Sequence, residues 1–213
     1  EEGGAIDDEA FIGCSNLRII DISDIEGRLG VKAFYDCRSI TTITTSPSLD
    51  VIYKRAFENC SSLTSVNLQY GLEVIGDRAF ANTAIETINI PSTVNFIGNG
   101  AFYGCSALTS INISSSVNSI GNGAFDRCPA LTSITVENNN NHYTSSNGIL
   151  FDHIGVKIIR WPEGKTQDVY YMPEEMNRIG ENALKNCTIN HLVHNHYTRF
   201  TQESFTDFHG TLH

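Results

Sequence analysis

Two successive stretches of the chain carry nearly the same sequence: residues 97–113 read IGNGAFYGCSALTSINI, and residues 120–136 read IGNGAFDRCPALTSITV. A phenylalanine preceded by alanine lies at the same place in both stretches. It recurs at steps of 22 or 23 residues, as Phe11, Phe34, Phe57, Phe80, Phe102 and Phe125. After one long interruption, Leu184 and Phe205 continue the series. Chance does not produce such spacing, so most of the chain is a tandem repeat.

Each repeat contains apolar positions that only stacking can bury. An aliphatic residue lies five positions before the aromatic one in most repeats, as Ile6, Leu29, Ile52, Ile75, Ile97, Ile120 and Ile179. The pattern Leu-x-x-Ile-x-Ile after the aromatic residue ends in period-2 alternation and predicts a short strand. The segment from Gly121 to Cys128, like its equivalents, is typical of a short helix or 3-10 turn. A unit of about 23 residues cannot bury these faces alone, so successive units must coil on one another.

The aromatic and cysteine positions predict a shared interior. Rings at equal steps lie over one another when the repeats stack, so Phe57, Phe80, Phe102 and Phe125 should be almost fully buried. Thr83 takes the cysteine position in the shortened repeat, and elsewhere that position holds Cys14, Cys37, Cys60, Cys105, Cys128 and Cys187. We expect reduced, buried thiols rather than disulfides, because such side chains suit a tight corner. No Cys-x-x-Cys pair occurs, which disfavours a zinc or redox site.

The repeat pattern Ile-Gly-x-x-Ala-Phe-x-x-Cys-x-x-Leu-x-x-Ile-x-Ile-Pro resembles that of the BspA-type leucine-rich repeat family over nearly the whole chain. The resemblance implies an α/β fold: a right-handed solenoid of about eight coils of about 23 residues. Each coil would hold a short strand, an extended segment and a short helix or 3-10 turn. It also implies a location outside the cell or on its surface, and an adhesin-like role.

The interruption between Phe125 and Leu184 predicts an inserted β-hairpin. Two apolar runs, residues 148–151 and 156–162, flank a short loop that contains Gly155, and residues 169–173 predict a returning strand. We therefore expect a single domain, residues 1–213. It would comprise N-terminal repeats in residues 1–136, a hairpin insertion in residues 137–175, and C-terminal repeats with a cap in residues 176–213. The hairpin either faces a partner or folds over the edge of the coil.

Small polar residues flank the inward-facing residue of each predicted strand. They form a flat ladder of hydroxyl and amide groups that could hydrogen-bond a protein or a glycan. The alternative is that the ladder only keeps an exposed sheet soluble. The candidate partner-binding residues are Thr42, Thr44, Ser65, Asn67, Thr87, Asn89, Ser110, Asn112, Ser133 and Thr135.

The charge balance disfavours two classes of partner. The chain has 213 residues, with 14 Lys and Arg against 24 Asp and Glu, for a formal net charge of −10. A negative surface repels phosphate backbones and anionic lipid headgroups, so we expect neither nucleic-acid binding nor binding to an anionic membrane surface. No apolar run is long enough to span a bilayer, so we expect no membrane insertion of this chain.

The sequence offers no catalytic or cofactor motif. A nucleophile elbow, a zinc-protease helix, a phosphate loop and a dinucleotide fingerprint are all missing in usable context, so we assign no catalytic, metal or cofactor residues. Histidines cluster near the C-terminus, but no Cys or carboxylate lies at a recognised ligand spacing. They fit a polar capping coil better: His191, His194, His196, His209 and His213.

These observations predict a non-catalytic recognition scaffold, extracellular or on the cell surface. It would bind a host or surface protein, such as an extracellular-matrix protein, through the strand face or the hairpin insertion. The alternatives are a structural spacer that displays another domain, a glycan-binding module, and a weak hydrolase that acts on glycans. The chain starts with EEGG and shows no apolar leader, so we expect a mature or trimmed product.

Overall fold

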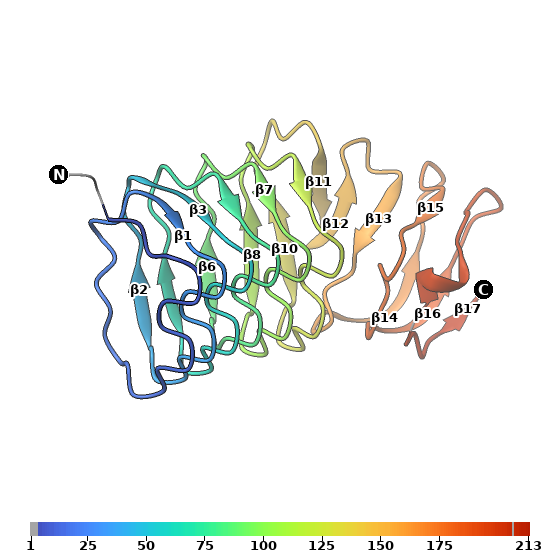
Figure 1. The fold of residues 1–213 in the computed structure, drawn as a ribbon. Helices are drawn as coiled ribbons and strands as arrows, with labels where there is room; N and C mark the ends of the chain where they lie inside the picture. The colour runs from blue at the N-terminus through green and yellow to red at the C-terminus, as the bar shows by residue number, and fades with distance from the viewer. Residues whose placement is uncertain (1–3, 206) are drawn as a thin grey trace.

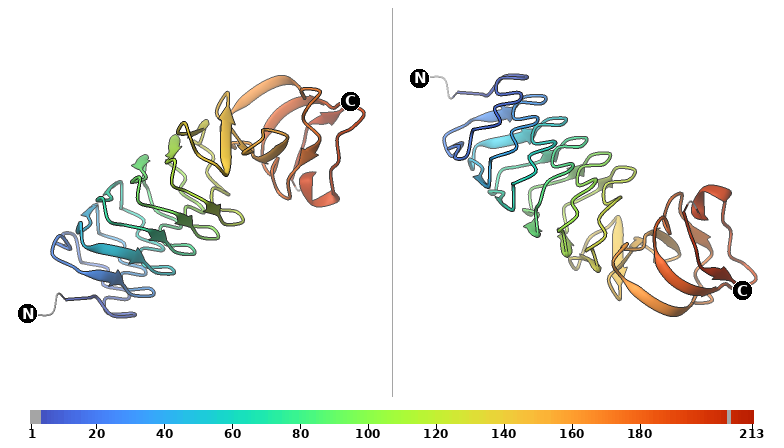
Figure 2. Two further views of the ribbon diagram at one scale, coloured as in Figure 1. Left: turned by 90° about the horizontal axis from the view of Figure 1, so that it is seen from above. Right: turned by 90° about the horizontal axis from the view of Figure 1, so that it is seen from below.

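The computed structural model describes residues 4–205 and 207–213. The chain winds into an elongated rod, with its N-terminus and C-terminus at opposite ends (Figure 1 and Figure 2). Successive coils lie side by side along the rod, and each is hydrogen-bonded to the next. The prediction of a solenoid of stacked repeats is therefore confirmed.

Two parallel sheets flank the interior of the rod. The first contains β1 (Gly27–Leu29), β3 (Leu49–Ile52), β5 (Val74–Ile75), β7 (Phe96–Ile97) and β9 (Ser119–Ile120). The second contains β2 (Thr42–Thr44), β4 (Ser65–Asn67), β6 (Thr87–Asn89), β8 (Ser110–Ile113) and β10 (Ser133–Val136). The second sheet holds the strands that the Leu-x-x-Ile-x-Ile pattern predicted. Where the first sheet lies, only an extended segment was predicted.

The interruption contains antiparallel strands. β11 (Tyr143–Ser146) pairs with β12 (Ile149–Asp152), and β12 pairs with β13 (Lys157–Arg160). The pairing of β12 with β13 confirms the predicted hairpin, whereas the strand β11 was not predicted. β15 (Arg178–Ile179) then adds to β13 in parallel. The last sheet is parallel and contains β14 (Thr166–Tyr171), β16 (Thr188–Val193) and β17 (Thr211–Leu212).

The helical part of the predicted α/β class is not confirmed. No α-helix forms in residues 4–205 or 207–213, where the helical structure is limited to a 3-10 turn, η1 (Gln202–Phe205). The residues two positions before and after each stacked phenylalanine have positive φ angles, such as 55° at Arg78 and 58° at Asn82, around Phe80. Left-handed residues on both sides of the ring interrupt the bonding pattern of a right-handed helix. Each segment from Gly to Cys is therefore a pair of tight turns.

These turns form hydrogen bonds from one coil to the next. The backbone N–H of Phe80 donates to the carbonyl of Ala101 in the next coil at 2.9 Å, whereas the adjacent Ala79 donates within its own coil. Coils that bond through their backbones approach closely. A Cβ atom at Gly98 would overlap the backbone of Asp77 in the preceding coil. The glycine that often follows the aliphatic position is therefore required by the spacing between coils.

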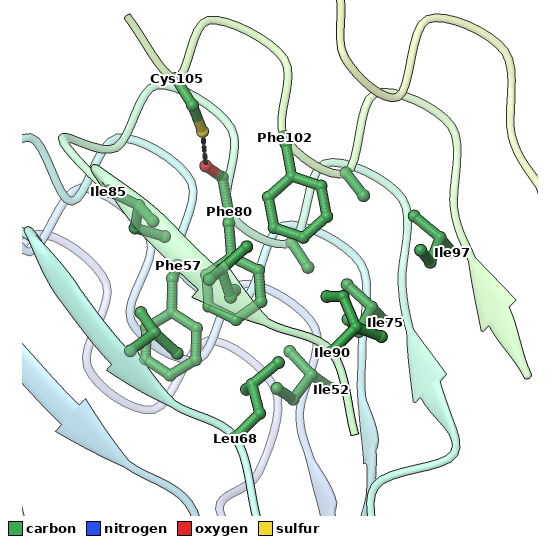
Figure 3. Packing of buried hydrophobic residues seen from close by; sticks show 14 of the residues in the cluster. Ile52, Phe57, Leu68, Ile75, Phe80, Ile85, Ile90, Ile97, Phe102 and Cys105 are labelled. Atoms are coloured by element: carbon green, nitrogen blue, oxygen red, sulfur yellow. Dashed lines mark hydrogen bonds between the residues drawn. The ribbon is translucent and has the colours of Figure 1, made fainter. Parts of the chain in front are cut away.

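The phenylalanine rings form one continuous stack in the interior. Successive rings from Phe11 to Phe125 have centroids 5.1 to 5.9 Å apart and planes within 8° of parallel. Phe57, Phe80 and Phe102 are 0% exposed and Phe125 is 3% exposed, which confirms their predicted burial. Figure 3 shows three of these rings in line, with Ile52, Ile75 and Ile97 of the first sheet nearby. The interior from Phe11 to Phe125 is thus a column shared by successive coils rather than a separate core in each.

A second hydrophobic cluster continues the interior beyond Phe125. It contains the fully buried Trp161, whose backbone N–H donates to the carbonyl of Ala183 at 2.8 Å. The stacked phenylalanines make the same bond, as Phe80 does to Ala101, so Trp161 occupies the aromatic position of its coil. This assignment was not predicted. β12 lies between the two clusters: Leu150 packs in the first, and Ile149 in the second.

A buried group of charges lies beside this junction. Arg160 is 5% exposed, and its guanidinium contacts the carboxylates of Glu163 at 2.6 Å and Asp126 at 3.1 Å. The same guanidinium donates to the carbonyl of Asn182 at 2.9 Å. Buried charges need such partners to offset their loss of hydration. The group therefore ties the last coil of the phenylalanine stack to the coils that follow the insertion.

The cysteine column packs as predicted except at its first member. All six thiols are free, and five of them are buried, but Cys14 is exposed. The Sγ of Cys105 donates to the carbonyl of Phe80 at 3.1 Å (Figure 3). Thr83, which takes the cysteine position of its coil, instead donates to the carbonyl of Phe80 in its own coil at 2.9 Å, and its hydroxyl lies 3.3 Å from the Sγ of Cys105. Cys14 lies in the first described coil, which has a neighbouring coil on one side only, so the prediction of burial is wrong for this residue.

Replacing Phe80 with alanine should lower the free energy of unfolding by about 3–5 kcal/mol, because it opens a cavity between two covering rings. Phe11 is 40% exposed and has one ring neighbour, so Phe11→Ala should cost markedly less. Chemical denaturation of both variants, followed by circular dichroism, measures the difference. Equal losses in the two variants would contradict the continuous stack.

The cysteine column should be protected from thiol reagents and should destabilise the protein at high pH. Burial raises the pKa of Cys60 to about 12 and that of Cys105 to about 11, from an ordinary 9.0. Because thiolates are the reactive form, Cys14 should react first in the native protein, and Cys14→Ser should remove the fast phase. Because the pKa of these thiols is higher in the folded protein than in the unfolded chain, they stabilise the fold fully below about pH 9. This stabilisation is lost as the pH rises to about 11–12. The melting temperature should therefore fall over that range. Six thiols that react at one rate would contradict this burial.

Candidate functional site

The ten predicted ladder residues lie together on the outer face of the second sheet. Strand pairing aligns them in register, so that Ser65 lies opposite Thr42 and Asn112 lies opposite Asn89. The residue between them in each strand, such as Ile111, points into the core and is buried. Asn112 and Ser133 are half-buried. The exposed ladder residues are Thr42, Thr44, Ser65, Asn67, Thr87, Asn89, Ser110 and Thr135.

A third column of exposed residues borders the ladder and was not predicted. It lies one position before each strand and holds mainly threonine. The hydroxyl of Thr109 donates to the carbonyl of Glu86 in the preceding coil at 3.2 Å, and that of Thr132 donates to the carbonyl of Thr109 at 3.2 Å. Recurrence of threonine at this position is a signal in the sequence that could have identified the column. The five strands of the second sheet contain no charged residue, so the outer face of these strands is neutral.

The C-terminal end of the ladder is hydrogen-bonded to the start of the insertion. The hydroxyl of Thr135 donates to Oδ1 of Asn112 at 3.0 Å, and the Nδ2 of Asn112 donates to Oε1 of Glu137 at 3.4 Å. The other oxygen of Glu137 accepts the backbone N–H of Ser115 at 2.9 Å. These bonds fix the orientation of Asn112, so this residue supports the face as well as contributing to it.

The turn between β11 and β12 covers the free edge of β10. The backbone N–H of Ile134 donates to the carbonyl of Gly148 at 2.8 Å, and that of Val136 donates to Oγ of Ser145 at 2.9 Å. This contact places the insertion over the edge of the coil and half-buries Ser133. The ladder and the insertion are therefore neighbouring parts of one surface rather than two separate regions.

Some of the charged side chains form ion pairs within the fold. Glu58 is 5% exposed and contacts Arg78 at 2.7 Å and Arg55 at 3.2 Å. Within residues 4–205 and 207–213 there is no group of three or more His, Cys, Asp or Glu that could hold a metal ion. Of the C-terminal histidines, His191 and His213 contact each other, with Nδ1 and Nε2 3.0 Å apart. The described chain also has no helix with the length and apolar character needed to span a membrane.

Solved structures of bacterial leucine-rich repeat proteins resemble this rod. A leucine-rich cell surface protein from Faecalibacterium prausnitzii A2-165 is 25% identical, with a TM-score of 0.79 over 92% of this chain and 54% of that one. A leucine-rich repeat protein from Bacteroides ovatus ATCC 8483 is 24% identical, with a TM-score of 0.71 and the same coverage. The pneumococcal vaccine antigen PcpA is 22% identical, with a TM-score of 0.69 over 85% of this chain and 54% of that one. The chain thus spans about half the length of these proteins.

The repeat itself also matches a known family. No curated protein sequence matches the chain. The family described as BspA type leucine rich repeat region matches in six copies, over residues 3–109, 27–147 and 81–210. These overlapping matches extend over almost the entire chain. The protein therefore belongs to the BspA-type leucine-rich repeat family.

Proposed function

We propose that the protein is a non-catalytic recognition scaffold, outside the cell or on its surface, that binds a protein partner through the polar ladder of its second sheet. The observation that carries the proposal is the in-register alignment of small, exposed hydroxyl and amide groups along five neighbouring strands. The resemblance to a solved protein described as a cell surface protein supports the location. The exposed ladder and this resemblance together support an adhesin-like role, with a host or surface protein as the partner.

The chemistry of the ladder suits an extended partner. Parallel strands repeat at about 4.8 Å, so each coil presents the same donors and acceptors one step further along the rod. Each hydrogen bond contributes about 0.5–1.5 kcal/mol net to the binding free energy, so tight binding requires hydrogen bonds to several coils. The strands offer no Trp or Arg of the kind that dominates compact interfaces. A partner that follows several coils therefore fits this face better than one that buries a single side chain.

Lysines placed on the ladder should block this binding without unfolding the protein. Ser65→Lys with Ser110→Lys puts two long charged side chains on the exposed face and should weaken binding by about tenfold or more. The assay is surface binding of purified extracellular-matrix proteins to the immobilised full chain, with the melting temperature as a check on folding.

The chain supplies a matched control for this experiment. Ser61→Lys with Ser106→Lys adds the same charge in the same two coils, at exposed positions four residues earlier and outside the strands. This control should bind like the unmodified chain. Failure of every matrix protein to bind, or equal binding by both variants, would count against the ladder as the recognition surface.

A further inference from the structure

A polar hollow lies at the start of the insertion, next to the end of the ladder. It has a volume of about 430 Å³, within the range of about 300–1,000 Å³ usual for small-molecule sites. The loop of residues 137–141 forms one wall, and β11 with His153 forms the other. The polar side chains that line it include Asn138, Asn139, Asn141, Thr144, Ser145 and His153.

The loop that forms the first wall is fixed by one buried side chain. Asn140 is 5% exposed, and its Nδ2 donates to the carbonyls of Ser114 at 3.0 Å and Val117 at 2.9 Å. Its Oδ1 accepts the backbone N–H groups of His142 and Tyr143, each at 2.8 Å. All four hydrogen bonds of this amide are thus used to hold the loop on the preceding coil. The wall is therefore ordered before any ligand arrives, which lowers the entropic cost of binding.

The remaining asparagines of the loop are available to a ligand. Asn138, Asn139 and Asn141 are exposed, and their side-chain amides make no hydrogen bond to another described residue. Asn139 has a φ of 69°, a left-handed conformation that asparagine tolerates well. A fixed loop thus presents three amides, each with a donor group and an acceptor group, around one hollow.

The charge of the hollow restricts the chemistry of its ligand. No Lys or Arg lines it, and its one carboxylate belongs to Glu137, which already accepts bonds from Ser115 and Asn112. An anionic ligand would meet this negative charge without a cation to offset it. Little apolar surface is available either, since the aliphatic and aromatic lining is limited to Val136 and Tyr143. A neutral ligand with many hydroxyl groups matches this lining better than an apolar peptide or an acidic group.

We propose that this hollow binds a neutral saccharide. The hydroxyl groups of a sugar both donate and accept hydrogen bonds, and the three amides together with the hydroxyl of Thr144 complement them. The volume suits a short saccharide or the end of a longer glycan. This site goes beyond the protein-binding ladder, because different residues form it and it takes a different class of ligand.

Saccharide binding to the full chain tests this site directly. Neutral oligosaccharides built from hexoses and N-acetylhexosamines, and sulfated and sialylated ones, are titrated by calorimetry and by saturation-transfer NMR. We expect binding of neutral saccharides only. Asn138→Ala with Asn141→Ala removes two amides that make no contact in the fold, so it should weaken binding by about tenfold or more while the melting temperature stays unchanged.

The control removes two other exposed amides. Asn67→Ala with Asn89→Ala alters the ladder and should leave saccharide binding unchanged, whereas the Asn138 and Asn141 variant should still bind a protein partner of the ladder. Three results would overturn the proposal: no neutral saccharide binds, acidic saccharides bind in preference, or the control loses binding while the loop variant keeps it.

Discussion

The structure depends on the hydrogen bond that the backbone N–H of a core aromatic residue donates to an alanine carbonyl in the next coil. The bond measures 2.8 Å from Phe34 to Ala56 and 2.9 Å from Phe80 to Ala101. It requires each coil to repeat the backbone conformation of the one before it. The left-handed residues around each ring, the glycines at close approaches and the column of small thiols all follow from this requirement. The stacked rings then fill the space that the bonded coils enclose.

This constraint explains what the sequence predicts well. Apolar residues that recur at a constant step must superimpose when coils bond in register, so the buried phenylalanines, the second sheet and most of the cysteine column could be identified from spacing alone. The predicted helices are not confirmed, because periodicity does not report the sign of φ. A signal was present, since Gly104, Asn82 and Asn59 occupy the same position after the ring, and these residue types favour left-handed backbone. Trp161 was missed because the insertion breaks the step that would have marked it.

The candidate surface also has a part that the sequence predicts and a part that it does not. The ladder could be predicted because apolar and polar residues alternate within each strand, and this alternation indicates which side chains face outward. The hollow could not, because it depends on bonds between distant residues: Asn140 reaches the carbonyls of Ser114 and Val117, and Glu137 reaches the backbone of Ser115. A run of asparagines looks like a solvated loop until the coil that holds it is known. Nothing in the local pattern separates Asn140, which is structural, from the exposed asparagines beside it.

The position of β12 between two hydrophobic clusters has a consequence for how the rod comes apart. In a solenoid each coil gains stability from its immediate neighbours, so a break in the stack divides the molecule into segments with their own opening free energies. Leu150 belongs to one segment and Ile149 to the other, and the phenylalanine column ends on one side of them. Amide hydrogens behind this boundary, around Trp161 and Leu192, should therefore exchange with solvent as a group distinct from those around Phe80. The C-terminal coils can therefore unfold locally while the coils of the phenylalanine stack stay folded.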